Sequence, residues 1–161
     1  QAESPQHHRW VYNNPLVPMP LHAGAAAKLL LALMPEATAT RILKRDGMVA
    51  FTKRTLRSLE SLLQELKGIR VKGYAISAQE VTDEIASIAV PLVRDVGSNQ
   101  PLAVISLTGP NARLPNATLK GYLRKMQLAS KSATARLEHV SDAGMQPTRP
   151  LPAIRRQHVY P

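Results

Sequence analysis

The sequence predicts an α+β fold, because stretches of good helix formers surround two apolar runs joined by a polar segment. The apolar runs are residues 88–93 and 102–105, and residues 94–100 between them are rich in turn formers. That pattern predicts a β-hairpin. A central antiparallel hairpin with helices before and after it is typical of the α+β class.

The elements that precede the hairpin follow from local composition. The first 20 residues hold four prolines and one extended candidate, residues 9–12, which predicts a strand followed by a stiff loop. Residues 21–33 are dominated by Ala, Leu and Lys, so a buried helix is expected there, stopped by Pro35. A second, short helix is expected over residues 36–44.

Residues 55–71 have the clearest amphipathic pattern of the chain. Its apolar stripe at helical spacing is Leu56, Leu59, Leu63, Leu66 and Ile69. Thr52 or Thr55 is expected to cap this helix and Gly73 to close it. Residues 74–76 then begin a strand.

A last helix is predicted over residues 117–140, capped by Asn116. Its expected apolar stripe is Leu119, Tyr122, Leu123, Met126, Leu128 or Ala129, and Leu137. From Asp142 onward there are prolines and no periodicity, which predicts a loose tail. We therefore expect one domain over residues 1–141 and a basic tail over residues 142–161.

Composition excludes several classes of protein. With 161 residues, of which 44% are hydrophobic, the chain suits one globular domain. It has no apolar run of about 18 residues, so no membrane span is expected. Cysteine is absent, which removes disulfides and thiolate chemistry and is compatible with the cytoplasm.

Catalytic and metal-binding motifs are not found either. The sequence contains no nucleophile elbow, phosphate loop or zinc-protease motif, and its five histidines have no metal-ligand spacing. We therefore expect no enzyme activity, no metal and no cofactor. His22 at a helix start could line a pocket mouth, but a histidine satisfied by backbone is the favoured interpretation.

The net charge of +10 is concentrated near the C-terminus. Residues 113–161 hold 9 Lys/Arg against 2 acidic residues, whereas residues 1–112 hold 12 against 9. A basic tail is more often solvated than functional, but it leaves nucleic-acid binding open as an alternative function. Glu80, Asp83 and Glu84 are interpreted as a solvated acidic loop.

Two polar features could bind a ligand. Ser106 and Thr108 lie two residues apart on the second strand, so both hydroxyls share one face of the sheet. Gly24, Ala25 and Ala26 are small residues at a helix start, where free amides and the helix dipole favour an anion such as a carboxylate. The alternatives are strand filler for the hydroxyls and close helix packing for the small residues.

Several motifs occur together in an order that is characteristic of one family. They are Gly73-Tyr74, the acidic loop, the hairpin and its closing Ser106-x-Thr108-Gly109-Pro110, preceded by Pro20-Leu21-His22-Ala23 and Phe51-Thr52-Lys53-Arg54-Thr55. This arrangement resembles the effector domain of IclR-type (isocitrate lyase regulator) transcription factors over roughly residues 4–137.

The resemblance implies a GAF/profilin-like antiparallel sheet flanked by helices, and a pocket for a small acid. The positions that match the family's ligand contacts are Ala25, Ala26, Ser77, Ser87, Ser106 and Thr108. Ser87 stands where the family often has Cys, and Ser77 where a ligand-binding Asp is common. The missing carboxylate at Ser77 weakens the case for a ligand with a hydroxyl or hydrated aldehyde.

The resemblance also implies partners. Family members begin with a winged helix-turn-helix, a linker helix and the first sheet strands, none of which precedes Gln1. The chain is therefore expected to be the sensing half, truncated on its N-terminal side, with DNA bound through a domain not present. A homodimer or homotetramer is expected. The alternatives are a non-sensing oligomerisation module of the same fold, or a nucleic-acid-binding protein driven by its basic tail.

Overall fold

The computed structural model describes residues 20–93 and 101–141. The expected strand at 9–12, the hairpin turn and the tail from residue 142 lie outside these described residues. The helices are α1 (Ala25–Leu33), α2 (Glu36–Asp46), α3 (Leu59–Lys72) and α4 (Asn116–Ser141), and the strands are β1 (Ala75–Ala78), β2 (Ile85–Val93) and β3 (Pro101–Pro110).

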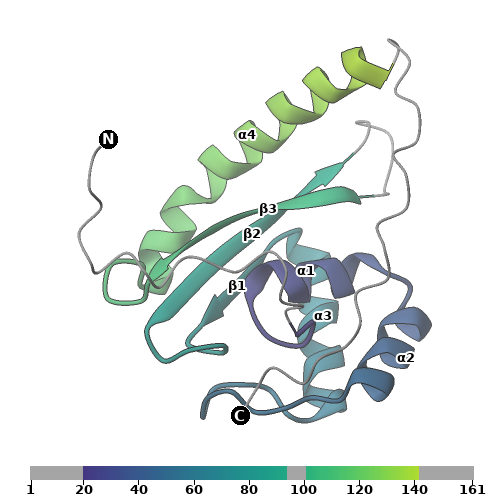
Figure 1. Ribbon diagram of the computed structural model, residues 1–161. Helices are drawn as coiled ribbons and strands as arrows, with labels where there is room; N and C mark the ends of the chain where they lie inside the picture. The colour runs from purple at the N-terminus through teal and green to yellow at the C-terminus, as the bar shows by residue number, and fades with distance from the viewer. Residues whose placement is uncertain (1–19, 94–100, 142–161) are drawn as a thin grey trace, which may run out of the picture.

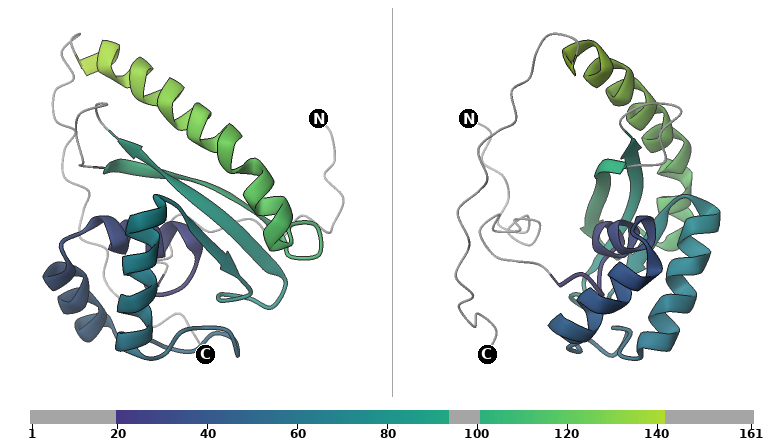
Figure 2. Two further views of the ribbon diagram at one scale, coloured as in Figure 1. Left: turned by 180° about the vertical axis from the view of Figure 1, so that it is seen from behind. Right: turned by 90° about the vertical axis from the view of Figure 1, so that its right-hand side faces the viewer.

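The strands form an antiparallel sheet in the order β1-β2-β3 (Figure 1). Both strands of the predicted hairpin are longer than their apolar runs, and the pairing is irregular between Leu92 and Val93. Helices cover both faces of this sheet, so the predicted α+β class is confirmed (Figure 2).

The two faces of the sheet belong to two separate cores. Alternation along β2 sends Ile88 and Val90 toward α4, where they pack with Leu119 and Met126. The opposite face carries Ala75 and Ala89, which pack against α1, and α3 packs against α1 in the same core. The sheet therefore lies between α4 on one face and α1, together with α3, on the other.

Helix α1 is shorter at its start than predicted. Residues 21–24 form a turn, and the helix begins at Ala25 rather than at residue 21. Gly24 has φ 89°, a conformation that side-chain-bearing residues rarely adopt and that cannot continue an α-helix. Helix α2 matches its prediction and continues two residues further, to Asp46, before Gly47.

The predicted cap of α3 is wrong. The helix begins at Leu59, and Ser58 caps it by accepting a hydrogen bond from the Ser61 amide. Thr55 does not cap the helix, because its hydroxyl is engaged elsewhere. It accepts hydrogen bonds from the amides of Phe51 and Thr52 and donates one to the Glu80 carbonyl. The predicted end is confirmed: Gly73, left-handed at φ 73°, follows the last helical residue.

The apolar stripe of α4 is partly wrong. Leu119 and Met126 are buried as predicted, but Tyr122 is 40% exposed and Leu128 is 57% exposed. The buried stripe continues instead through Ser130 and Thr134, which keep the spacing of three or four residues. Ser130 is tolerated there because its hydroxyl donates to the Pro91 carbonyl at 2.6 Å. Asn116 is the first helical residue rather than a residue before the helix.

Candidate functional site

Three hydroxyl-bearing residues form a row across the sheet. Ser77 on β1 lies opposite Ser87 on β2, and Ser87 lies opposite Thr108 on β3. Ser77 and Ser87 are buried, whereas Thr108 is partly exposed. The antiparallel register therefore places three of the predicted site residues side by side, on the face that α1 covers.

Ser106 extends this row toward solvent. Its hydroxyl lies 3.3 Å from that of Thr108, as expected for two residues that share a face of one strand. Ser106 is exposed and lies opposite Ala89. Ile105 and Leu107 point the other way, into the core under α4.

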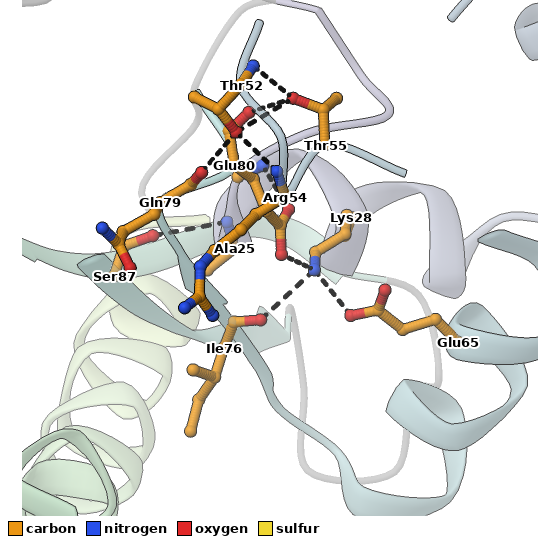
Figure 3. A network of polar contacts seen from close by, with 11 residues as sticks. Ala25, Lys28, Thr52, Arg54, Thr55, Glu65, Ile76, Gln79, Glu80 and Ser87 are labelled. Carbon is orange, nitrogen blue, oxygen red and sulfur yellow. Dashed lines mark hydrogen bonds and ion pairs between the residues drawn. The ribbon is translucent and has the colours of Figure 1, made fainter. Parts of the chain in front are cut away.

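The start of α1 reaches the hydroxyl row. The Ala25 amide donates a long hydrogen bond, 3.4 Å, to Ser87 Oγ (Figure 3). Ala26 is the next residue of the helix and is partly exposed. The helix start and the sheet therefore meet at a contact between residues 62 positions apart in the sequence.

A buried lysine lies one turn further along α1. The Lys28 side chain is 0% exposed, and its Nζ donates to Glu65 Oε1 at 2.6 Å and to Glu80 Oε1 at 2.5 Å. It also donates to the Ile76 carbonyl at 3.3 Å. A buried ammonium is stable only when it is paired and hydrogen-bonded, and all three of these acceptors are supplied by the fold.

Glu80 corrects the prediction of a solvated loop. Its side chain is only 11% exposed, and its second carboxylate oxygen accepts the Gly24 amide at 3.1 Å. Asp83 and Glu84 are exposed as predicted. Glu80 differs because Lys28 and the positive end of α1 compensate its charge after burial.

Two threonine hydroxyls hold the backbone next to Glu80. Thr52 Oγ1 donates to the Gln79 carbonyl and Thr55 Oγ1 to the Glu80 carbonyl, each at 2.6 Å (Figure 3). Gln79 has φ 61°, a left-handed conformation that is uncommon outside glycine. These hydrogen bonds offset the strain of the Gln79 backbone and fix the direction in which the Glu80 side chain points.

The His22 ring is hydrogen-bonded to the backbone, which confirms the favoured interpretation. It is buried, and its Nε2 lies 2.7 Å from the Val49 carbonyl oxygen. Its ring stacks on Phe51 with centroids 5.5 Å apart. His22 therefore ties the loop before α3 to the start of α1.

The ion cluster of Lys28, Glu65 and Glu80 was missed by sequence reasoning, although a signal was present. Lys28 is the single charged residue in a helix that is otherwise apolar and was expected to be buried. A charge in such a position requires a partner. The identity of the partner was not deducible, because Glu65 and Glu80 lie 37 and 52 positions away.

Metal-binding and membrane-spanning features are absent from the described part of the chain. Within residues 20–93 and 101–141, no group of three or more His, Cys, Asp or Glu side chains is arranged to hold a metal ion. No helix among the described residues is long and apolar enough to cross a membrane. One open hollow, on α2, is lined by Glu36, Ala37, Thr40, Arg41 and Lys44, and contains none of the predicted site residues.

Comparison with known proteins decides the family. The family described as "Bacterial transcriptional regulator IclR C-terminal" matches residues 17–135. The chain belongs to this family. It corresponds to the effector-binding domain of an IclR-type regulator.

Individual relatives support the assignment. The chain is 36% identical to the HTH-type transcriptional repressor AllR of Escherichia coli over 96 residues, which cover 60% of this chain and 35% of AllR. It is 31% identical to the HTH-type transcriptional regulator XynR of Escherichia coli over 111 residues, which cover 69% and 43%. The chain thus spans less than half the length of these relatives.

Solved structures have the same fold. The C-terminal domain of Escherichia coli KdgR has a TM-score of 0.66 at 28% identity, with 74% of this chain and 71% of that chain covered. The inducer-binding domain of PobR from Acinetobacter, crystallised as a double mutant with 3-hydroxybenzoic acid, has a TM-score of 0.69 at 19% identity. That match covers 78% of this chain and 75% of the PobR chain.

Proposed function

We propose that this IclR-type domain senses a small organic acid and pairs the subunits of a transcriptional regulator. The observation that carries the sensing proposal is the contact of the Ala25 amide with Ser87, in the middle of the row Ser77, Ser87 and Thr108. The free amides at the helix start can donate hydrogen bonds to the carboxylate of a ligand. The aligned hydroxyls can both donate hydrogen bonds to the ligand's other polar groups and accept them from these groups.

The ligand's carboxylate is proposed to bind the amides of Ala25 and Ala26. The preceding amide, that of Gly24, already donates to Glu80. Ser87 then turns its hydroxyl to the ligand, and Ser77, Ser106 and Thr108 contact the rest of the molecule. The neighbours Ala75 and Ala89 share this face and are small, so the hydroxyls are its principal polar groups.

The buried charges favour a monocarboxylate. Lys28 is neutralised by two carboxylates, so the cluster of Lys28, Glu65 and Glu80 has a net charge of −1 when all three groups are ionised. A second carboxylate on the ligand would be repelled by Glu80, and no unpaired cation offsets that repulsion within the cluster. We therefore expect monocarboxylates to bind more tightly than dicarboxylates of similar size.

The longer relatives suggest how binding would be transmitted. AllR and XynR are named as HTH-type regulators, and we propose that the whole protein has a corresponding domain that binds DNA. We also propose that the protein acts in the cytoplasm and is not an enzyme. PobR is a relative in fold whose domain was crystallised with an aromatic hydroxy acid. An effector changes DNA occupancy only if it prefers one state of the homodimer or homotetramer.

Thermal-shift and calorimetric titration with a panel of mono- and dicarboxylates tests the sensing proposal. A ligand at a hundredfold its Kd should stabilise the fold by about 2.7 kcal/mol. Ser106→Ala should weaken binding, whereas Ser132→Ala, an exposed serine on α4, should leave it unchanged. Unaltered affinity in Ser106→Ala would remove that residue from the site.

A lack of stabilisation by the whole panel would sink the sensing proposal. The same fold would then serve as a non-sensing oligomerisation module. Light scattering separates the two claims, because subunit pairing predicts a dimer or tetramer whether or not an acid binds. A monomer at all concentrations would contradict the pairing proposal.

A further inference from the structure

Three cations line one flank of α4. Lys120, Arg124 and Lys131 are exposed and lie four and seven residues apart, so successive side chains fall on one stripe of the helix. The buried stripe that begins with Leu119 and Met126 faces the sheet. Figures 1 and 2 show no other described element over the side of α4 turned away from the sheet.

Among the side chains that the structure describes, which on α4 end at Arg136, the α4 basic stripe (Lys120, Arg124 and Lys131) makes no ion pair. Residues 113–137 contain no Asp or Glu. The ion pairs among the described residues involve Lys28, Arg45 and Arg70, which lie on α1, α2 and α3. Like charges four residues apart destabilise a helix, so an anionic partner would relieve a repulsion that the fold itself leaves in place.

We propose that the α4 basic stripe binds the phosphate backbone of duplex DNA. Its three charges extend over about 16.5 Å, at 1.5 Å of rise per residue. A duplex carries one negative charge for about each 1.7 Å of its axis, so phosphates are in reach of all three cations in many registers. Contacts to phosphate alone carry no base information, and the binding is independent of sequence.

An acidic protein fits this stripe less well than a duplex. Protein interfaces are dominated by a few buried anchors, enriched in Trp, Tyr and Arg, at their centre. The exposed Tyr122 lies on the opposite flank of α4, since two residues correspond to about 200° of rotation from Lys120. The stripe therefore offers cations without an aromatic anchor between them.

Fluorescence anisotropy with a labelled mixed-sequence duplex, measured on the full chain over a series of salt concentrations, tests the proposal. The triple variant Lys120→Gln, Arg124→Gln, Lys131→Gln should make the negative slope of log K against log salt shallower, by about 0.9 for each phosphate that is no longer neutralised and about 2.7 for all three. Glutamine is a good helix former, so α4 should be retained, which circular dichroism checks.

Two variants with the same change in net charge serve as controls. Lys44→Gln, Lys67→Gln, Lys72→Gln removes exposed cations from α2 and α3, and Arg149→Gln, Arg155→Gln, Arg156→Gln removes the cations after residue 142. Retention of the wild-type slope in both controls supports the proposal. It is overturned if the wild-type chain does not bind the duplex, if either control reduces the slope as much as the α4 variant does, or if polyglutamate competes as well as DNA at equal charge.

Discussion

The two faces of the sheet use the same three strands for different purposes. On β2, Ile88 points to α4 and its neighbour Ser87 points to α1, and β3 repeats the contrast with Leu107 and Thr108. The α4 face is closed by large apolar side chains. The α1 face carries hydroxyls, small residues and a fully buried lysine.

The contrast agrees with the proposal that the α1 face binds a ligand while the α4 face provides stability. Buried ion pairs are seldom more stabilising than apolar side chains of the same volume, because desolvation offsets much of the attraction. A domain that needed only a second core could fill the α1 face as it fills the α4 face. The proposed ligand site would account for the polar construction of the α1 face, which stability alone does not require.

The largest effect on the α1 side is expected from Lys28→Met. The substitution keeps the length of the side chain but leaves Glu80, 11% exposed, without its cation. Losing one partner of a buried pair costs about 3–5 kcal/mol of the free energy of unfolding, measured by urea denaturation. Arg45→Ala breaks an exposed pair on α2 and should leave the unfolding midpoint unchanged. Equal effects of the two variants would show that the Lys28 cluster is not desolvated.

Ile88→Ala should have the largest effect on the α4 side. Ile88 is 0% exposed, and truncation would leave a cavity between β2 and α4. The expected loss is about 2–5 kcal/mol of unfolding free energy. Ligand affinity should stay near that of the wild type below the transition, since the side chain points away from the hydroxyl row. A loss of ligand binding without a loss of stability would contradict the assignment of stability to the α4 face and of binding to the α1 face.

Ser130→Ala removes one of the buried polar groups on the packed face of α4. The Pro91 carbonyl would lose the donor that now lies 2.6 Å away, and a loss of about 1 kcal/mol is expected. Chemical denaturation measures it, with Ser132→Ala on the exposed side as the matched control. A stabilised Ser130→Ala variant would mean that water replaces the serine without penalty.

Ser87→Ala should have the smallest effect on stability and a clear effect on binding. The hydrogen bond from the Ala25 amide is long, 3.4 Å, so its net contribution is expected near the lower limit of about 0.5 kcal/mol. The affinity for a monocarboxylate found by the panel should nevertheless fall. Destabilisation as large as that of Ile88→Ala would instead make Ser87 a structural residue.

Much of the fold was predictable from local patterns. The hairpin, the left-handed stop at Gly73 and the shared face of Ser106 and Thr108 follow from turn residues, glycine conformation and strand alternation. The cap of α3 was not predictable, because Thr55 and Ser58 are both good caps locally. The choice between them depends on the Glu80 carbonyl, which binds Thr55 from 25 positions away.

The family, the order of the elements and the shared face of Ser106 and Thr108 could be predicted from residue types and short-range spacing, which are read directly along the chain. Ser77 and Ser87 became candidates only through the resemblance to the IclR family. Only the tertiary structure decided that the Ala25 amide meets Ser87, that Glu80 occupies the Gly24 amide and that Lys28 is buried between two carboxylates. Burial and charge pairing are properties of segments brought together by folding, and no local pattern encodes which distant carboxylate will meet a given amine.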